Sequence, residues 1–179
     1  MKVIYYKGLI ADDMGLTPTE RILYSFLLNK SINTTDGVYN EYGEFDGSTL
    51  SDYDMLELPI LHQNELSKKT NVMSQGAISL AYKGLEKKGF VDLRFGTIQH
   101  HGLFAKGYFT LFVDSGLRGE LLIFYSWLRN LSKGNPIISS MSKIAELYHV
   151  PMANVRDYFH RLREKNLLER NDFGNLIVK

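Results

Sequence analysis

Basic, amide and hydroxyl side chains recur at helical spacing in two stretches of the sequence. The first group lies opposite the apolar positions of a predicted helix over residues 74–88 and comprises Gly76, Ser79, Leu80, Lys83 and Lys87. Serine and lysine side chains can hydrogen-bond to phosphate oxygens or to the edges of bases. Leu80 is the apolar exception, and it suits either a thymine methyl group or a protein interface.

The second group lies on a predicted helix over residues 151–165. Its outward positions are Ala153, Asn154, Arg156, Asp157, His160, Arg161, Arg163 and Glu164. Arginine can bind guanine and asparagine can bind adenine through paired hydrogen bonds. Asp157 and Glu164 would repel phosphates, so this helix would have to approach a nucleic acid at an angle. For both groups an ordinary solvated helix surface remains the alternative.

The elements that would position the second group are predicted over residues 142–179. A short helix presents Ile144, Ala145 and Tyr148 to one side, and His149 and Val150 form a turn. Pro151 suits the first turn of the next helix, where its missing N–H group is not needed. The inner face of that helix then consists of Val155, Tyr158, Phe159 and Leu162. Asn166 can end it in the left-handed conformation, and residues 167–170 and 175–178 flank the turn sequence NDFG as a hairpin.

A similar succession is predicted around the first group. Residues 61–69 form a short helix, Asn71 and Val72 turn, and Ser74 caps a helix that stops at Gly89. The inner face of this helix consists of Ile78, Ala81, Tyr82 and Leu85. Residues 90–94 and 108–113 are predicted to pair as a hairpin with a long tip, which contains His100, His101 and Lys106.

A longer helix precedes each succession. Thr17 and Glu20 form a capping box at the start of a helix over residues 18–30, and residues 2–8 favour a strand. Ser115 is predicted to cap the second long helix, which Gly134 ends. Between the first long helix and the first short one, residues 33–59 are predicted to form an acidic loop, with a small hairpin inside it as the alternative.

The order helix, helix, turn, helix, hairpin resembles winged helix-turn-helix DNA-binding domains. The segments "IAELYHVPMANVRDYFHRLREKNLLER" and "ELSKKTNV…AYKGLEKKGFV" carry the resemblance. Two such units in tandem are similar to the RepA-like modules of plasmid and phage replication initiators. The acidic insertion and the lack of an extra C-terminal region depart from that family. The resemblance implies that the helix of each outward group enters the major groove and that the hairpin, or wing, contacts the DNA backbone.

The predicted fold is therefore mainly α with small β wings (α+β), in two tandem winged helix-turn-helix domains. Residues 1–114 form the first domain, with residues 33–59 as its insertion, and residues 115–179 form the second. Residues 1–60 carry a net charge of −6 and the remainder +7, a distribution typical of a protein that meets phosphates on one side. Chance clustering of surface charges is the alternative.

Several classes of function are not expected. The sequence has no cysteine, no long apolar run at its start, and no phosphate-binding glycine loop or nucleophile motif. We therefore expect no enzyme activity, cofactor, metal site or membrane association, and a cytoplasmic location. His100 and His101 are expected to titrate as ordinary loop histidines rather than to bind a metal.

The expected function is binding of double-stranded DNA by a replication initiator or accessory protein of a plasmid, phage or other mobile element. A transcription regulator and a protein-interaction module, with a protein partner on the acidic loop 33–59, are the alternatives. The chain could act as a monomer or a homodimer. The candidate DNA-binding residues are Ser74, Gln75, Ser79, Lys83, Lys87, Arg94, Lys106, Asn154, Arg156, His160, Arg161, Arg163 and Arg170.

Overall fold

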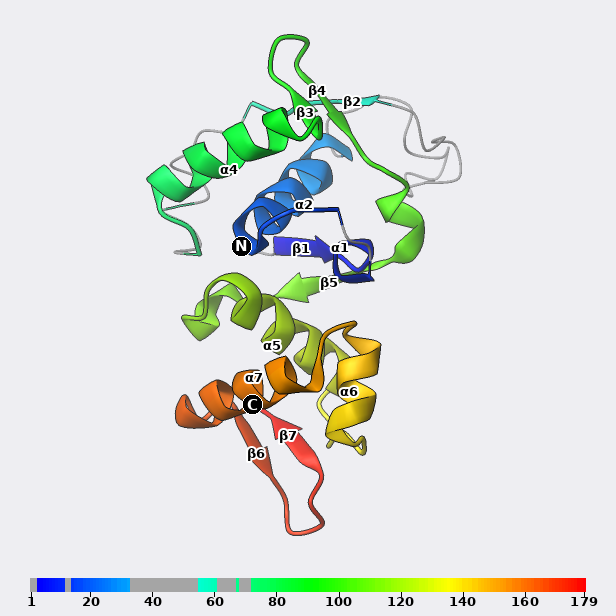
Figure 1. Ribbon diagram of the computed structural model, residues 1–179, viewed down its shortest axis with the longest axis vertical. Coiled ribbons are helices and arrows are strands. Elements are labelled where there is room, and N and C mark those ends of the chain that lie inside the picture. The colour runs from blue at the N-terminus through cyan, green and yellow to red at the C-terminus, as the bar shows by residue number, and fades with distance from the viewer. Residues whose placement is uncertain (1–2, 12–13, 33–54, 61–66, 68–71) are drawn as a thin grey trace.

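The protein has a mixed α+β fold in which two halves lie along the long axis, each ending in a hairpin at an opposite end of the molecule (Figure 1). The computed structural model describes residues 3–11, 14–32, 55–60, 67 and 72–179. The first half contains β1 (Val3–Tyr6), α1 (Gly8–Ala11), α2 (Pro18–Ile32), β2 (Met55–Glu57), α4 (Gln75–Lys87), β3 (Val91–Asp92), β4 (Thr97–Gln99), η2 (Leu103–Lys106) and β5 (Tyr108–Leu111). The second half contains η3 (Val113–Ser115), α5 (Gly119–Ser132), α6 (Met141–Leu147), α7 (Met152–Glu164), β6 (Leu168–Arg170) and β7 (Leu176–Val178).

The capping box predicted for α2 is confirmed. The Thr17 amide donates to Glu20 Oε2 at 2.7 Å, and the Glu20 amide donates to the Thr17 hydroxyl at 3.3 Å. These bonds satisfy amide groups that the first helical turn leaves without partners. The cap predicted for α4 is also confirmed, since the Ser74 hydroxyl accepts the amide of Ala77 at 3.2 Å.

The strand pairing predicted for the first hairpin is wrong. The return strand is β4, which pairs with β3 on one side and with β2 on the other. The hairpin therefore has a short tip over residues 93–96, and β2 lies within the range predicted as the acidic loop. Residues 33–54 of that loop, and all of the predicted helix 61–69 except Ser67, lie outside the described residues.

Strand β5, predicted as the return strand, instead pairs antiparallel with β1. The register places Val3 opposite Leu111 and Tyr6 opposite Tyr108. Ser25 of α2 secures β1, because its hydroxyl accepts the Tyr6 amide at 3.0 Å and donates to the Ile4 carbonyl at 3.0 Å. The β1–β5 ribbon thus lies between the two halves and contacts helices of both (Figure 1).

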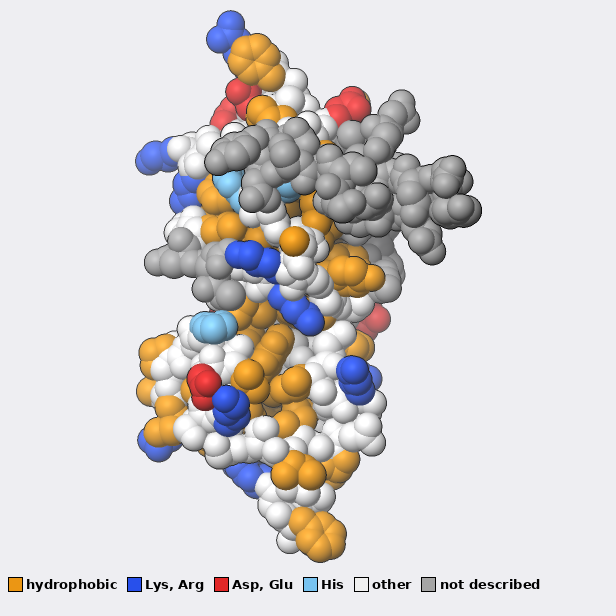
Figure 2. Space-filling view, turned by 90° about the vertical axis from the view of Figure 1, so that its right-hand side faces the viewer, with side chains coloured by type: hydrophobic (Ala, Val, Ile, Leu, Met, Phe, Trp, Pro, Cys, Tyr) orange, Lys and Arg blue, Asp and Glu red, His pale blue; other side chains and the backbone are white. Residues whose placement is uncertain are grey.

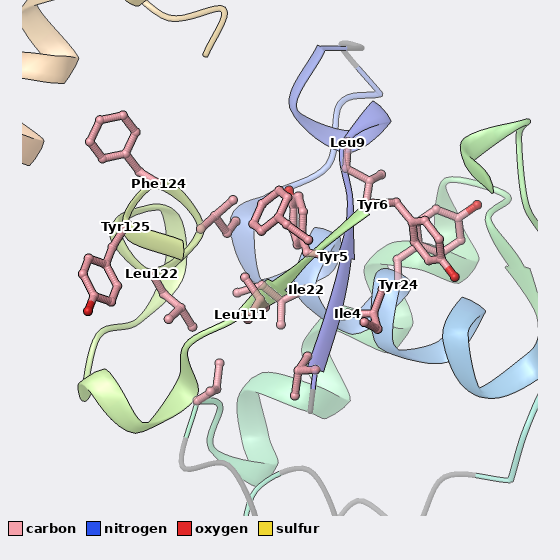
Figure 3. Packing of buried hydrophobic residues seen from close by; sticks show 14 of the residues in the cluster. Ile4, Tyr5, Tyr6, Leu9, Ile22, Tyr24, Leu111, Leu122, Phe124 and Tyr125 are labelled. Carbon is pink, nitrogen blue, oxygen red and sulfur yellow. The ribbon is translucent and has the colours of Figure 1, made fainter. Parts of the chain in front are cut away.

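Buried apolar residues are continuous across this ribbon. Figure 3 shows Tyr5 of β1 and Leu111 of β5 near Ile22 of α2 on one side and Leu122 of α5 on the other. All four side chains are buried. The two halves therefore share one hydrophobic core rather than meeting through a polar surface.

In the second half, the predicted inner faces of the two shorter helices are largely confirmed. Ile144, Ala145, Val155, Phe159 and Leu162 are buried, and Asn166 has the left-handed conformation expected after the helix, with φ 57°. Tyr148 is buried as well, and its ring meets Phe124 of α5 edge to face at 4.9 Å. Tyr158 is only partly buried.

The predicted cap of α5 is wrong. Ser115 does not cap α5: it ends the short η3 turn, and Arg118 precedes the helix without a side-chain cap. Pro151 is the N-cap residue of α7, directly before its first turn, with φ −57° and ψ 144°, and its carbonyl accepts the amide of Asn154 at 3.0 Å. Across the described ranges, no helix combines the length and apolar character needed to cross a bilayer.

Candidate nucleic-acid interface

The outer face of α4 carries the first group of candidate residues. Lys83, Lys87 and Gln75 are exposed, and Ser79 is partly buried. Ser74 is exposed, but its hydroxyl already accepts the Ala77 amide and so has lost part of its capacity to accept other bonds. The result is a face with two lysines about one helical turn apart, which suits contacts with successive phosphates.

Leu80 lies on the same helix with 72% of its surface exposed. It borders a shallow groove of about 370 Å³ between α2 and α4, which Thr17, Thr19, Ala77 and Ala81 also line. The apolar side chain is not needed for the core, because Ile78, Ala81 and Leu85 supply the buried face of α4. Leu80 is therefore available to a binding partner.

The position of α4 depends on Glu20 of α2. The Glu20 carboxylate lies 2.6 Å from Lys88 Nζ, which also donates to the Gly15 carbonyl at 2.7 Å. Gly84 allows this approach, since a Cβ atom there would lie 1.9 Å from Glu20 Oε1. Lys88 thus holds α2 and α4 together, whereas Lys83 and Lys87 remain on the outer surface.

The pKa of the Glu20 carboxyl reflects these contacts. Burial alone would raise this pKa, but the hydrogen bonds from Lys88 and Thr17 outweigh burial and lower it below its usual value of 4.5. Glu20 therefore remains ionised at neutral pH and continues to hold the start of α2 and the end of α4.

The outer face of α7 carries the second group. Asn154, Arg156, His160, Arg161 and Arg163 are all exposed. Two acids of the same helix lie beside two of them: Asp157 Oδ2 is 3.5 Å from Arg161 Nη1, and Glu164 Oε1 is 3.4 Å from His160 Nε2. Exposed pairs of this kind are weak and can exchange for phosphate contacts.

The structure separates the two basic residues that were assigned to the first hairpin. Arg94 lies at its tip, exposed, with its guanidinium over the ring of Phe95 at 5.4 Å. Lys106 does not belong to the hairpin: it ends η2, and its side chain lies against Gly8, where a Cβ atom would be 2.8 Å from Lys106 Cδ. In the second hairpin, the Arg170 guanidinium donates to the Gly174 carbonyl.

The surroundings of the two histidines differ. His100 is buried, its ring stacks on Phe104 at 5.0 Å, and its Nδ1 accepts the Gly102 amide at 3.2 Å. His101 packs against Phe90, and burial followed by the neighbouring His100 lowers its pKa below 6.5. The ordinary pKa predicted for His101 is therefore wrong. Among the described residues, no group of three or more potential ligands could hold a metal ion.

Two exposed aromatic residues at the hairpin tips were not predicted as site residues. Phe95 is 71% exposed and Phe173 is 88% exposed. The available signal was the pair Phe-Gly inside each predicted turn region, because a large apolar residue in a turn gains little from folding. The candidate surfaces are thus the outer faces of α4 and α7 and the tips of the two hairpins.

The arrangement can serve recognition of an anionic polymer, since cations, amides and exposed aromatic rings lie on elements that project from a shared core. Comparisons of the chain with protein-family models, with curated proteins and with solved structures found no match.

Proposed function

We propose that this protein binds double-stranded DNA through α4 and α7, as two tandem winged helix-turn-helix units. The observation that carries the proposal is the repeated arrangement: in each half a helix with exposed cationic residues on its outer face is followed by a hairpin. This order supports an arrangement in which each helix enters a major groove and each hairpin lies along the backbone.

The two helices would perform different tasks. Lys83 and Lys87 present flexible point charges that suit phosphate oxygens, whose neutralisation releases condensed counterions. Arg156 and Asn154 carry planar groups that suit paired hydrogen bonds with guanine and adenine. The first helix would therefore supply mainly affinity, and the second would supply sequence preference.

A role as replication initiator or accessory protein of a mobile element fits a chain that carries two different recognition helices. A dimeric transcription regulator binds a palindrome with the same recognition helix from each subunit, whereas α4 and α7 differ in their outward side chains. A cytoplasmic location follows from such a role.

Exposed Leu80 beside the α2–α4 groove favours a second candidate, a protein-interaction module. A partner that covers Leu80 would occupy the same face of α4 as DNA. The two functions would then exclude each other on this helix.

The test is binding of the full chain to duplex DNA from upstream of its own gene, compared with a scrambled duplex of equal length and composition. We expect tighter binding to the native sequence and an affinity that falls linearly on a log–log plot against salt concentration. Absence of binding to both duplexes at low salt would contradict the proposal. Leu80→Ala separates the two candidates, with Leu147→Ala at an exposed position of α6 as the control. DNA binding that is unchanged by Leu80→Ala would mean that Leu80 does not contact DNA and remains available to a protein partner.

A further inference from the structure

We infer that the tip of the first hairpin, Arg94 and Phe95, is a wedge that enters the minor groove of duplex DNA, partly unstacks a base step and bends the duplex. This inference rests on the proposed function. It adds a mode of binding that neither recognition helix provides.

The tip presents its aromatic ring outward without a folding role. Phe95 is 71% exposed, and the core of this hairpin is supplied by Val91 and Ile98 instead. Figure 2 shows apolar side chains standing out at both ends of the molecule, with a basic side chain beside the upper one. An exposed aromatic ring at the extreme end of a hairpin is placed for contact with another molecule rather than for stability.

The turn holds the backbone of the tip in one conformation. Asp92 Oδ1 accepts the amide of Arg94 at 2.9 Å and the amide of Phe95 at 3.0 Å, and Gly96 follows with φ 63°. The ring is therefore attached to an ordered turn, so that less conformational entropy is lost when it binds.

The positive charge of Arg94 beside the ring favours the minor groove of DNA over an apolar protein pocket as the site that the tip enters. The Arg94 guanidinium lies over the Phe95 ring at 5.4 Å, so a cation accompanies the apolar surface. A narrow minor groove has an enhanced negative potential that attracts arginine, and apolar side chains that enter it wedge between base steps. An apolar pocket of a partner protein would require this cation to be paired or left in water.

The second hairpin provides a natural comparison. Phe173 is also exposed, its amide donates to Asn171 Oδ1 at 3.1 Å, and Gly174 follows with φ 79°. However, Arg170 donates to the Gly174 carbonyl, and the acidic Asp172 precedes the ring. Each tip contains one aspartate, but Asp92 of the first hairpin is partly buried and accepts two amides of the turn, whereas Asp172 is exposed directly beside the ring. We therefore assign the wedge to the first hairpin, where Arg94 takes the position before the ring.

The experiment uses the full chain and a duplex of about 30 base pairs, in which 2-aminopurine replaces the adenines of flexible TA steps. Unstacking raises the fluorescence of 2-aminopurine. The natural protein should raise the signal, Phe95→Ala should lose most of the rise, and Phe95→Leu should restore part of it because leucine is also an apolar wedge. Phe173→Ala, the matched control, should keep the rise. All three variants should melt at the temperature of the natural protein, since both rings are exposed.

The outcomes separate the wedge from the proposed function. If the natural protein does not shift the anisotropy of an end-labelled copy of the duplex, DNA binding itself fails. If it binds without a fluorescence rise, or if Phe95→Ala keeps the rise, the wedge is wrong and DNA binding stands. If Phe173→Ala loses the rise equally, the assignment to the first hairpin is wrong. Sedimentation without DNA completes the test: self-association that Phe95→Ala abolishes would assign the ring to a second copy of the chain and overturn the inference.

Discussion

Arg21 of α2 forms an ion pair with Glu120 of α5, and this contact joins the two halves of the protein. The other oxygen of the Glu120 carboxylate accepts the Tyr148 hydroxyl at 2.7 Å. Burial, followed by the nearby Glu120, raises the pKa of Tyr148 well above 10, so this hydroxyl remains a donor. The side chains of Arg21 and Glu120 are only 17% and 23% exposed, so water has limited access to either charge.

We predict that Glu120→Gln destabilises the protein by roughly 1–3 kcal/mol, because it leaves the partly buried Arg21 charge without its counterion. Urea denaturation of the full chain would measure this change. Glu146→Gln is the matched control: Glu146 forms an exposed pair with Lys143 at 2.9 Å, and its loss should cost less than about 1 kcal/mol. Equal costs for both variants would mean that the contact between the halves contributes no more than a surface ion pair.

The effect of Gly84→Ala should change sign with the residue at position 20. In the natural protein, the new methyl group would displace the Glu20 carboxylate from Lys88 and Thr17, so we expect a loss of stability. In a Glu20→Ala background the obstruction is gone, and alanine should stabilise α4 by about 0.5–1 kcal/mol over glycine. A double-mutant cycle on thermal unfolding measures both effects. A loss of the same size in the two backgrounds would contradict this account of Gly84.

The lowered pKa of Glu20 predicts how stability depends on pH. A carboxyl group whose pKa is lower in the folded protein than in the unfolded chain stabilises the fold above the unfolded value of about 4.5. That contribution disappears as the pH falls through the folded pKa. Glu20→Gln should therefore reduce the dependence of the unfolding free energy on pH below about 4.5, because the natural carboxylate becomes protonated there and its stabilisation of the fold is lost. Urea titrations at several pH values would check this, and unchanged pH dependence would refute it.

Changing Lys83 and Lys87 together to alanine should reduce the slope of a plot of log DNA affinity against log salt concentration by about one to two. Both side chains are exposed, so the fold should not change. A control that replaces Lys7, in the turn after β1, and Lys143 of α6 removes the same charge away from α4 and should leave the slope nearly constant. If both double variants flatten the slope equally, α4 has no special role in contacting phosphates.

Arg156→Ala should relax sequence preference in one part of the DNA site only, by about 1–3 kcal/mol if the contact with guanine is bidentate. The reason is that α7 and α4 carry different outward residues and one chain contains both. Footprinting combined with sedimentation of the complex would measure this. A symmetric footprint that holds two chains, weakened equally on both sides, would instead indicate a dimeric transcription regulator.

Local signals predicted most of the helices. The Thr17–Glu20 box and the Ser74 cap involve residues three positions apart, so their bonds depend little on the rest of the chain. The apolar spacing in α7 likewise identified Val155, Phe159 and Leu162 as buried. Because the apolar spacing identified the inner face of each helix, helix geometry then gave the outward positions of the candidate residues on α4 and α7.

Contacts between distant residues could not be predicted in the same way. Residues 97–99 and residues 108–111 both have strand-forming composition after β3, and alternation in a strand does not identify its partner. Pairing of Tyr108–Leu111 with β1 removed that strand from the hairpin and with it Lys106 from the candidate site. The Arg21–Glu120 pair depends on the same packing of β1 and β5 between the halves, so no local pattern indicated it.

The pairing of β1 with β5 also has a consequence for the order of folding. Val3 pairs with Leu111, so a long stretch of chain must close into a loop before the ribbon can form. Closing this loop costs conformational entropy before the contacts of the ribbon stabilise the protein. By contrast, α5, α6, α7 and the second hairpin all lie within residues 119–178, so their mutual contacts close shorter stretches of chain than the pairing of Val3 with Leu111 does. Contacts of short sequence separation form faster, so the second half should become ordered first and provide the surface on which the first strand is finally captured.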